Sequence, residues 1–252
     1  MKNNELDRNI IKSVVKALNL LEILAGHEKL GVSELSEITG FGKSTTHRML
    51  NTLKYLNYVD QDLESDDYFV SMKLYELGNK VANKIPIKNI ARPHLEMLFN
   101  KVNETVNLGV IDNQSVLYLD KIVSKEPLRI ELDIGLKVPI YSSALGKTLA
   151  AFNNDIKLDN IEYVKHTEKT IDSNEKFYKE LEKIRRQGYA FDNEEYIKGL
   201  VCIAVPVFNS KNKAVASISV SLPAARLNEG DMEYYVDLLR KCTKSIEKDL
   251  FL

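Results

Sequence analysis

The sequence contains little cysteine and no long apolar run. Two cysteines among 252 residues, Cys202 and Cys242, exclude a disulfide framework and a paired-cysteine metal site, and they suit a reducing compartment. No apolar run approaches the roughly 20 residues that cross a bilayer. The first residues, MKNNELDRNI, lack the basic and then apolar order of a secretory signal. We therefore expect a soluble, cytoplasmic protein with no metal, no cofactor and no membrane partner.

An excess of charge of either sign is also absent. The 35 basic and 36 acidic side chains give a formal net charge of -1, which by itself identifies no partner and is unfavourable for binding nucleic acid. Hydrophobic residues make up 44% and charged residues 28% of the chain, both near the averages of globular proteins. The length is sufficient for one large or two modest domains.

A helix-turn-helix pattern is present between residues 32 and 59. This stretch, VSELSEITGFGKSTTHRMLNTLKYLNYV, contains two segments with helical apolar spacing on either side of a Thr-Gly-Phe-Gly turn. A preceding helix is expected over residues 11–25, with Val14, Leu18, Leu21 and Ala25 on one stripe. Apolar residues at 58–59 and 68–70 flank a polar stretch and predict a hairpin. The sequence thus predicts a winged helix-turn-helix domain over residues 1–71.

The start of the second helix of this motif carries side chains suited to duplex DNA. Between residues 40 and 58 the basic residues have no acidic neighbour, and short polar side chains there can reach base edges. Ser33 is predicted as the N-cap of the first helix. The predicted DNA-binding residues are Ser33, Lys43, Ser44, Thr45, His47, Arg48 and Lys54. Alternatively, Ser44 and Thr45 only cap the second helix, and His47 is an ordinary surface residue.

The predicted wing is acidic. Residues 1–72 have a net charge of -3, and five acids crowd residues 60–67. These are Asp60, Asp62, Glu64, Asp66 and Asp67. Because like charges repel, we expect this wing to stand off the phosphate backbone.

The rest of the chain changes from helical to alternating periodicity. A linker helix is predicted over residues 72–85, ended by Pro86, and after a connector at 87–92 Pro93 suits the first turn of another helix. Predicted strands cover residues 105–111, 116–123, 128–132, 188–192, 200–208 and 214–222, and predicted helices cover 144–152, 175–187 and 229–250. Hairpin turns between the strands predict an α+β fold with a mainly antiparallel sheet flanked by helices. We assign residues 72–90 to the linker and 91–252 to a second domain.

Five segments together resemble one known family. They are TGFGKSTTHRMLNTL, ARPHLEMLFNKVNETVNL, VPIYSSALGKTLAAF, GYAFDNEEYIKGLVCIAVPVF and SISVS. Their order and approximate spacing are similar to those of IclR-type transcriptional regulators, over nearly the whole chain. The resemblance implies an N-terminal winged helix that binds operator DNA and a C-terminal GAF-like domain that binds a small metabolite.

Two features of the second domain suit an anionic ligand. A helix is predicted to begin at Ala144, with Leu145 next. The small side chains in its first turn leave the free backbone N–H groups accessible to a carboxylate. Ser217, Ser219 and Ser221 share one face of a strand and need hydrogen-bonding partners, which a polar ligand would supply. Lys147 follows in ALGKT, a segment that lacks the glycine spacing of a phosphate-binding P-loop.

The resemblance implies an effector site for a small keto or hydroxy acid. Its implied members are Asp192, Cys202, Ser219 and Ser221, the backbone of Ala144 and Leu145, and an apolar side of Ile130, Val138 and Leu200. Three alternatives remain from the residues alone. Cys202 is a buried small hydrophobe, the serines face water, or Asp192 is a turn or capping residue.

We expect a ligand-responsive regulator of a catabolic operon, without catalytic residues. One winged helix makes few phosphate contacts, so a homodimer or a dimer of dimers is expected, with the linker helix as the first dimer contact. The alternative is a metabolite-binding or hydrolytic GAF-like protein whose winged helix serves protein interaction. For hydrolysis, His166 is the one histidine that could join Cys202 and Asp192 in a nucleophile set.

Overall fold

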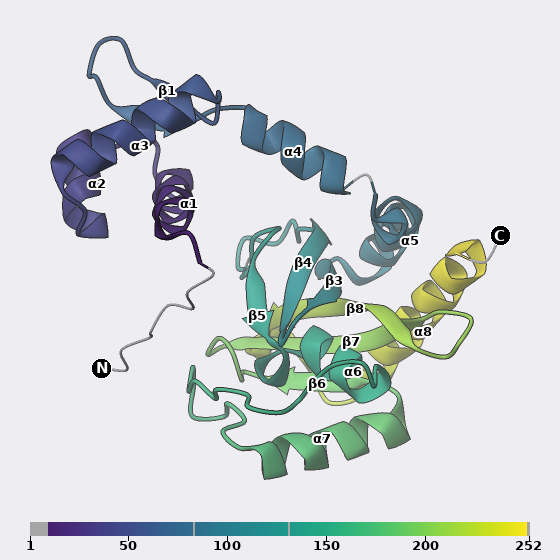
Figure 1. The fold of residues 1–252 in the computed structure, drawn as a ribbon. Helices are drawn as coiled ribbons and strands as arrows, with labels where there is room; N and C mark the ends of the chain where they lie inside the picture. The colour runs from purple at the N-terminus through teal and green to yellow at the C-terminus, as the bar shows by residue number, and fades with distance from the viewer. Residues whose placement is uncertain (1–9, 83, 131, 251–252) are drawn as a thin grey trace. The chain divides into compact units, whose positions relative to one another are not determined.

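The computed structural model describes residues 10–82, 84–130 and 132–250, and the chain divides into two compact units, Met1–Lys84 and Ile85–Leu252 (Figure 1). Within the described residues, the N-terminal unit has one apolar core and the C-terminal unit has two, one on each face of its sheet. Among the described residues no helix is both long and apolar enough to cross a membrane.

The N-terminal unit is a winged helix-turn-helix, as predicted. Its elements are α1 (Lys12–Ala25), α2 (Val32–Thr39), α3 (Lys43–Tyr55), β1 (Val59–Gln61), β2 (Tyr68–Val70) and α4 (Lys73–Ala82). Gly40 ends α2 at a φ of +70°, a left-handed conformation that glycine adopts without steric cost. Leu24 of α1, Leu35 of α2 and Leu50 of α3 are fully buried in the shared core. This packing fixes the orientation of α3 relative to α1 and α2.

One prediction for this unit is wrong. The N-cap of α2 is Gly31, whose N–H donates to the Glu34 carboxylate at 2.9 Å, so Ser33 lies inside the helix and caps nothing. In α1 the buried side chains are Leu20, Leu21 and Leu24, whereas Val14 and Leu18 are about half exposed. α1 has apolar residues on two adjacent stripes, and periodicity alone does not say which of them packs on the core.

The C-terminal unit is built on one antiparallel sheet in the order β5-β4-β3-β8-β7-β6. Its elements are α5 (Pro86–Val102), β3 (Thr105–Asp112), β4 (Ser115–Ile122), β5 (Lys137–Pro139), η1 (Ile140–Ser142), α6 (Ala144–Phe152), α7 (Asn174–Gln187), β6 (Ala190–Asn193), β7 (Leu200–Phe208), β8 (Ala214–Pro223), η2 (Ala224–Arg226) and α8 (Asp231–Leu250). α5 and α8 cover one face, and α6 and α7 cover the other (Figure 1). The predicted α+β class is confirmed.

Two boundaries in this unit differ from prediction. Pro86 begins α5, and the expected connector at 87–92 and Pro93 both lie within that helix. Proline suits the first turn, where an N–H has no intrahelical acceptor, so Pro86 starts a helix rather than only ending one. The strand expected over 128–132 is absent from the described residues of that stretch. β5 pairs with the edge of β4 instead, with Val138 opposite Val116.

Candidate functional site

The first two turns of α3 present a row of exposed polar side chains. Thr46 is excluded from this row because it is fully buried, with its hydroxyl donating to the Gly42 carbonyl at 3.4 Å. The N-cap of α3 is Gly42, so Ser44 and Thr45 do not cap the helix, and that alternative is wrong. The exposed row consists of Lys43, Ser44, Thr45, His47 and Arg48.

Asn51, which was not predicted from the sequence, extends this row by one turn. Its side-chain amide lies 3.5 Å from Nδ1 of His47, and both side chains are exposed. Asparagine can pair with adenine through two hydrogen bonds, so this position suits base recognition. The four-residue spacing from His47 was the available signal. Lys54, one turn further, donates to Oε1 of Gln61 at 2.9 Å and joins α3 to the wing.

The wing partly neutralises its own acidic charge. Lys29 Nζ lies 2.9 Å from Asp62 Oδ2, and Asp62 also accepts hydrogen bonds from the backbone N–H groups of Glu64 and Ser65. The hydrogen bond from Lys29 is the largest cause that lowers the pKa of Asp62 to about 2. One of the five acids is thus paired within the unit.

A row of buried polar side chains crosses the sheet beneath α6. Asp192 of β6 lies opposite Cys202 of β7, which lies opposite Ser221 of β8. The Ser221 hydroxyl donates to Cys202 Sγ at 3.1 Å. Asn107 Nδ2 on β3 donates to the hydroxyls of Ser219 and Ser221 at 3.2 and 3.0 Å. All five residues are buried, so the alternative in which the serines face water is wrong.

The first turn of α6 packs closely against η1 because Gly146 has no side chain. A Cβ on Gly146 would lie 2.5 Å from the Cα of Ile140. Ser143 caps the helix by accepting from the Gly146 N–H at 3.1 Å. The N–H groups of Ala144 and Leu145, in the first turn, have no acceptor within the helix. The buried apolar cluster around them includes Val138 and Leu200, with Ile130 packed against it.

Lys147 is fully buried on α6 and binds a carboxylate rather than serving a phosphate loop. Its Nζ lies 2.6 and 2.8 Å from the two carboxylate oxygens of Glu195 and 2.7 Å from the carbonyl oxygen of Phe191. Glu195 was not predicted from the sequence. A buried lysine requires an acidic partner, but a partner 48 residues away has no local sequence signal.

Burial dominates the protonation of the candidate site. It raises the pKa of Asp192 to about 7, with a further increase from the Glu195 charge and an opposing decrease from Lys147. Asp192 also accepts from the Glu195 N–H at 2.8 Å, so it caps a turn as one alternative held. Burial raises the pKa of the Cys202 thiol well above its ordinary value. The thiol therefore stays protonated and is a poor nucleophile.

His166 does not complete a nucleophile set. Its ring packs against Tyr196 with centroids 4.7 Å apart, and its backbone N–H donates to Thr170. Cys202, within the described part of the chain, is hydrogen-bonded to a serine and not to a histidine. The described contacts of Cys202 therefore include no histidine base.

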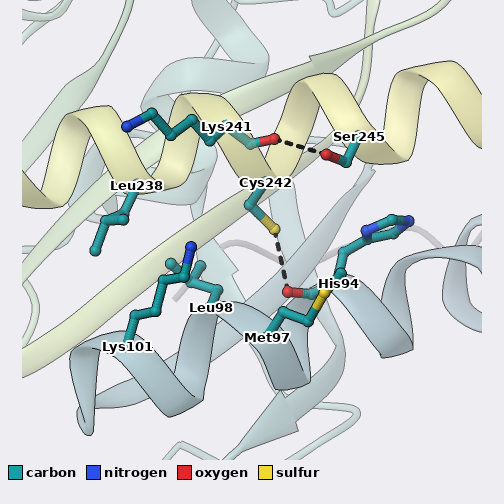
Figure 2. A pocket seen from close by; sticks show the side chains of 8 residues that line it. All are labelled: His94, Met97, Leu98, Lys101, Leu238, Lys241, Cys242 and Ser245. Carbon is teal, nitrogen blue, oxygen red and sulfur yellow. Dashed lines mark hydrogen bonds between the residues drawn. The ribbon is translucent and has the colours of Figure 1, made fainter.

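A separate pocket of about 140 Å³ lies between α5 and α8 on the opposite face of the sheet (Figure 2). Cys242 Sγ donates to the His94 carbonyl at 3.5 Å, and the Ser245 hydroxyl donates to the Lys241 carbonyl at 3.0 Å. His94 Nε2 lies 2.8 Å from Asp249 Oδ2. Because the sheet separates this pocket from the row beneath α6, the two cannot form one site.

Comparisons with known proteins cover both units. The protein-family model for the bacterial transcriptional regulator IclR C-terminal domain matches residues 79–248, and the model for the IclR helix-turn-helix domain matches residues 13–63. The chain is 37% identical to the regulator KdgR of Escherichia coli over 99% of this chain and 97% of that protein. It is 31% identical to the regulator XynR of the same organism, over 96% and 98% of the two chains.

A solved structure shares the fold over nearly the whole chain. The crystal structure of the Thermotoga maritima IclR protein covers 95% of this chain and 98% of its own, with a TM-score of 0.80 and 31% identity. Such regulators bind operator DNA and small-molecule effectors, and they are not enzymes, so the hydrolytic alternative is wrong. The chain belongs to the IclR family and is a DNA-binding transcriptional regulator.

Proposed function

We propose that this regulator senses a small keto or hydroxy acid and, in response, controls a catabolic operon. It would do so by binding an operator that contains two half-sites. The observation that carries the proposal is the buried polar row beneath α6, formed by Asp192, Cys202, Ser219 and Ser221. A core region that contains this many polar side chains beside a helix N-terminus suits an anionic ligand.

The chemistry of the site selects the ligand class. The first-turn N–H groups of Ala144 and Leu145 suit a carboxylate, because they are free donors at the positive end of the helix dipole. A keto or hydroxyl oxygen next to that carboxylate would meet the serine hydroxyls and Asp192. The apolar residues Ile130, Val138 and Leu200 suit a short carbon chain.

The roles on α3 follow from exposure and reach. Ser44, Thr45 and His47 are assigned to base edges, and Lys43, Arg48 and Lys54 to phosphate or guanine. Ser33 is in the first turn of α2, where side-chain and backbone groups suit a phosphate contact. The acidic wing is assigned a minor part in binding.

Exposed apolar side chains support a homodimer. Val14 and Leu18 of α1 and Tyr75, Leu77 and Val81 of α4 are all exposed within the N-terminal unit. The α4 helix has an apolar stripe and no buried residue in the described structure. Pairing of such stripes between two copies would bring two α3 helices to adjacent half-sites. A dimer of dimers would extend the same arrangement.

Thermal-shift screening of small carboxylates, followed by operator titration, tests the proposal. Glyoxylate, pyruvate, hydroxy acids and sugar acids are the screening set, and the DNA upstream of the protein's own gene is the first operator candidate. We expect at least one acid to raise the melting temperature and to change operator affinity several-fold. The double variant Ser219→Ala/Ser221→Ala should lose both responses yet still bind DNA, whereas Ser245→Ala at an exposed position of α8 should keep them. No response to any acid would contradict the proposed ligand class.

A further inference from the structure

The ion pair between Lys147 and Glu195 is buried beside the candidate effector site. Lys147 is fully buried and Glu195 is nearly so, and Glu180 approaches Lys147 at 4.0 Å from α7. Removing two charges from water carries a large desolvation cost that their attraction only partly offsets. Helix packing alone would be served equally well by apolar side chains at these positions, so a role for the charges is indicated.

Both members of the pair hold the backbone around Asp192. Lys147 Nζ donates to the carbonyl of Phe191, the residue before Asp192, and the Glu195 N–H donates to Asp192 Oδ1 at 2.8 Å. The hydroxyl of Thr170 donates to the Glu195 carbonyl at 2.7 Å from a separate segment. Lys147 therefore holds the backbone that precedes Asp192, and the Glu195 N–H holds the Asp192 carboxyl group.

The groups that face Asp192 act in opposite directions. Glu195 and Glu194 carry negative charge on the segment after β6, and Lys147 carries positive charge on α6. Cys202 of β7 and Tyr118 of β4 also lie close enough to Asp192 to interact with it electrostatically. Burial and the two glutamates favour the neutral carboxyl group, whereas Lys147 favours the carboxylate.

We propose that Lys147 and Glu195 are positioning residues that hold Asp192 poised between its charged and neutral forms, so that a carboxylate effector binds with uptake of one proton at Asp192. The effector step rests on the proposed function, whereas the control of Asp192 does not. A bound anion repels the Asp192 carboxylate, which then takes a proton from solvent. The resulting O–H donates to an oxygen of the effector, so the preferred ligand carries an acceptor beside its carboxylate.

The sign of the pH dependence follows from this linkage. An anion bound near Asp192 raises the pKa of that carboxyl further above its value of about 7 in the free protein. Effector affinity is then highest below that pH and falls as the pH rises above it. The fall is at most about tenfold per pH unit, because one proton is exchanged.

Carbon-13 NMR of the full-length protein labelled at aspartate carboxyls tests the control of Asp192. Its resonance is identified by its loss in Asp192→Asn. We expect Asp192 in the wild type to titrate near neutral pH, Glu195→Gln to lower its pKa and Lys147→Met to raise it. Lys169→Met is the matched control, because Lys169 pairs with Glu194 at 2.6 Å but is half exposed, and it should shift Asp192 little.

Opposite shifts in the two variants distinguish electrostatic positioning from a general loss of packing. Shifts in the same direction, or titration of wild-type Asp192 near its ordinary value, would overturn the proposal. Should Lys147→Met not fold, the double variant Lys147→Met/Glu195→Leu replaces the pair with apolar groups. Asp192 must then still titrate above its ordinary value, through burial alone.

Calorimetric titration with pyruvate at pH 6 and pH 8, in two buffers of different ionisation enthalpy, tests the proton uptake. Tighter binding at pH 6, with net uptake of about one proton at pH 8 and little uptake at pH 6, supports the proposal. Binding of equal strength at both pH values, without uptake, overturns it. If neither pyruvate nor any other screened acid binds, the carboxylate-sensing function fails, and the NMR titration separately decides the control of Asp192.

Discussion

Arg48 and Thr45 are both exposed on α3, but they carry different chemistry. Arg48→Ala removes a phosphate-directed charge, so we predict about tenfold weaker binding to all DNA sequences and a salt slope reduced by about one. Thr45→Ala removes a short polar group and should change base preference more than overall affinity. Anisotropy titrations at several salt concentrations measure both effects. Arg186 is an exposed arginine of α7, and Arg186→Ala is the control. A change of base preference in Arg48→Ala with uniform weakening in Thr45→Ala would show that the two roles are inverted.

Asn107 joins two serines of the buried polar row by hydrogen bonds. Asn107→Ala removes the donor to Ser219 and Ser221 inside a buried layer, so unfolding should become easier by about 1–3 kcal/mol. Urea denaturation measures this. Asn100→Ala at an exposed position of α5 should change stability by less than about 0.5 kcal/mol. Equal effects at the two positions would argue against a coupled polar layer.

Some site residues are predictable from sequence, and others are not. The alternation of Ser217, Ser219 and Ser221 placed them on one face, and the family resemblance grouped Ser219 and Ser221 with Asp192 and Cys202. Asn107 bonds to a serine 112 residues away, and Lys147 bonds to Glu195 48 residues away. The order of the strands and the placement of the helices bring such partners together, and local patterns in one sequence do not predict either. Asn107 and Glu195 therefore emerge only from the fold.

Substitution by alanine should have opposite effects on stability at two helical glycines, Gly146 and Gly78. In α6 a Cβ on Gly146 would meet Ile140 backbone atoms at 2.5 and 2.7 Å, so Gly146→Ala should destabilise by about 1–3 kcal/mol and weaken effector binding. In α4 a Cβ on Gly78 meets nothing within 4 Å, so Gly78→Ala should stabilise by about 0.5–1 kcal/mol. Thermal unfolding of both variants tests this, and a stabilising Gly146→Ala would refute the close packing of α6.

The ends of helices and strands were predictable where several sequence signals marked the same residues. The predicted bounds of α6 and β7 match the structure, because apolar content, capping residues and flanking turns coincide there. Pro86 and Pro93 were misinterpreted, because a proline can start a helix or lie within one when packing compensates. The alternation over residues 128–132 resembled a strand, yet the edge of β4 was already paired with β5.

Dimerisation of the whole molecule should depend on α4. Val81→Asp places a charge on its exposed apolar stripe, so we predict a shift from dimer towards monomer and weaker binding to a full operator. Binding to an isolated half-site should change less. Analytical ultracentrifugation and titration with both DNA lengths measure this. Asn79→Asp adds the same charge at a polar position of the helix, and an equal effect from it would point to charge alone.

We propose that an effector bound beneath α6 changes the affinity of α3 for operator DNA. The most direct test is operator affinity measured with and without the acid identified by screening, in the wild type and in Ser219→Ala/Ser221→Ala. We expect operator affinity to change several-fold in the wild type and not at all in the variant. By linkage, operator should change effector affinity by the same factor. Identical operator affinities in the wild type, with effector bound, would contradict it.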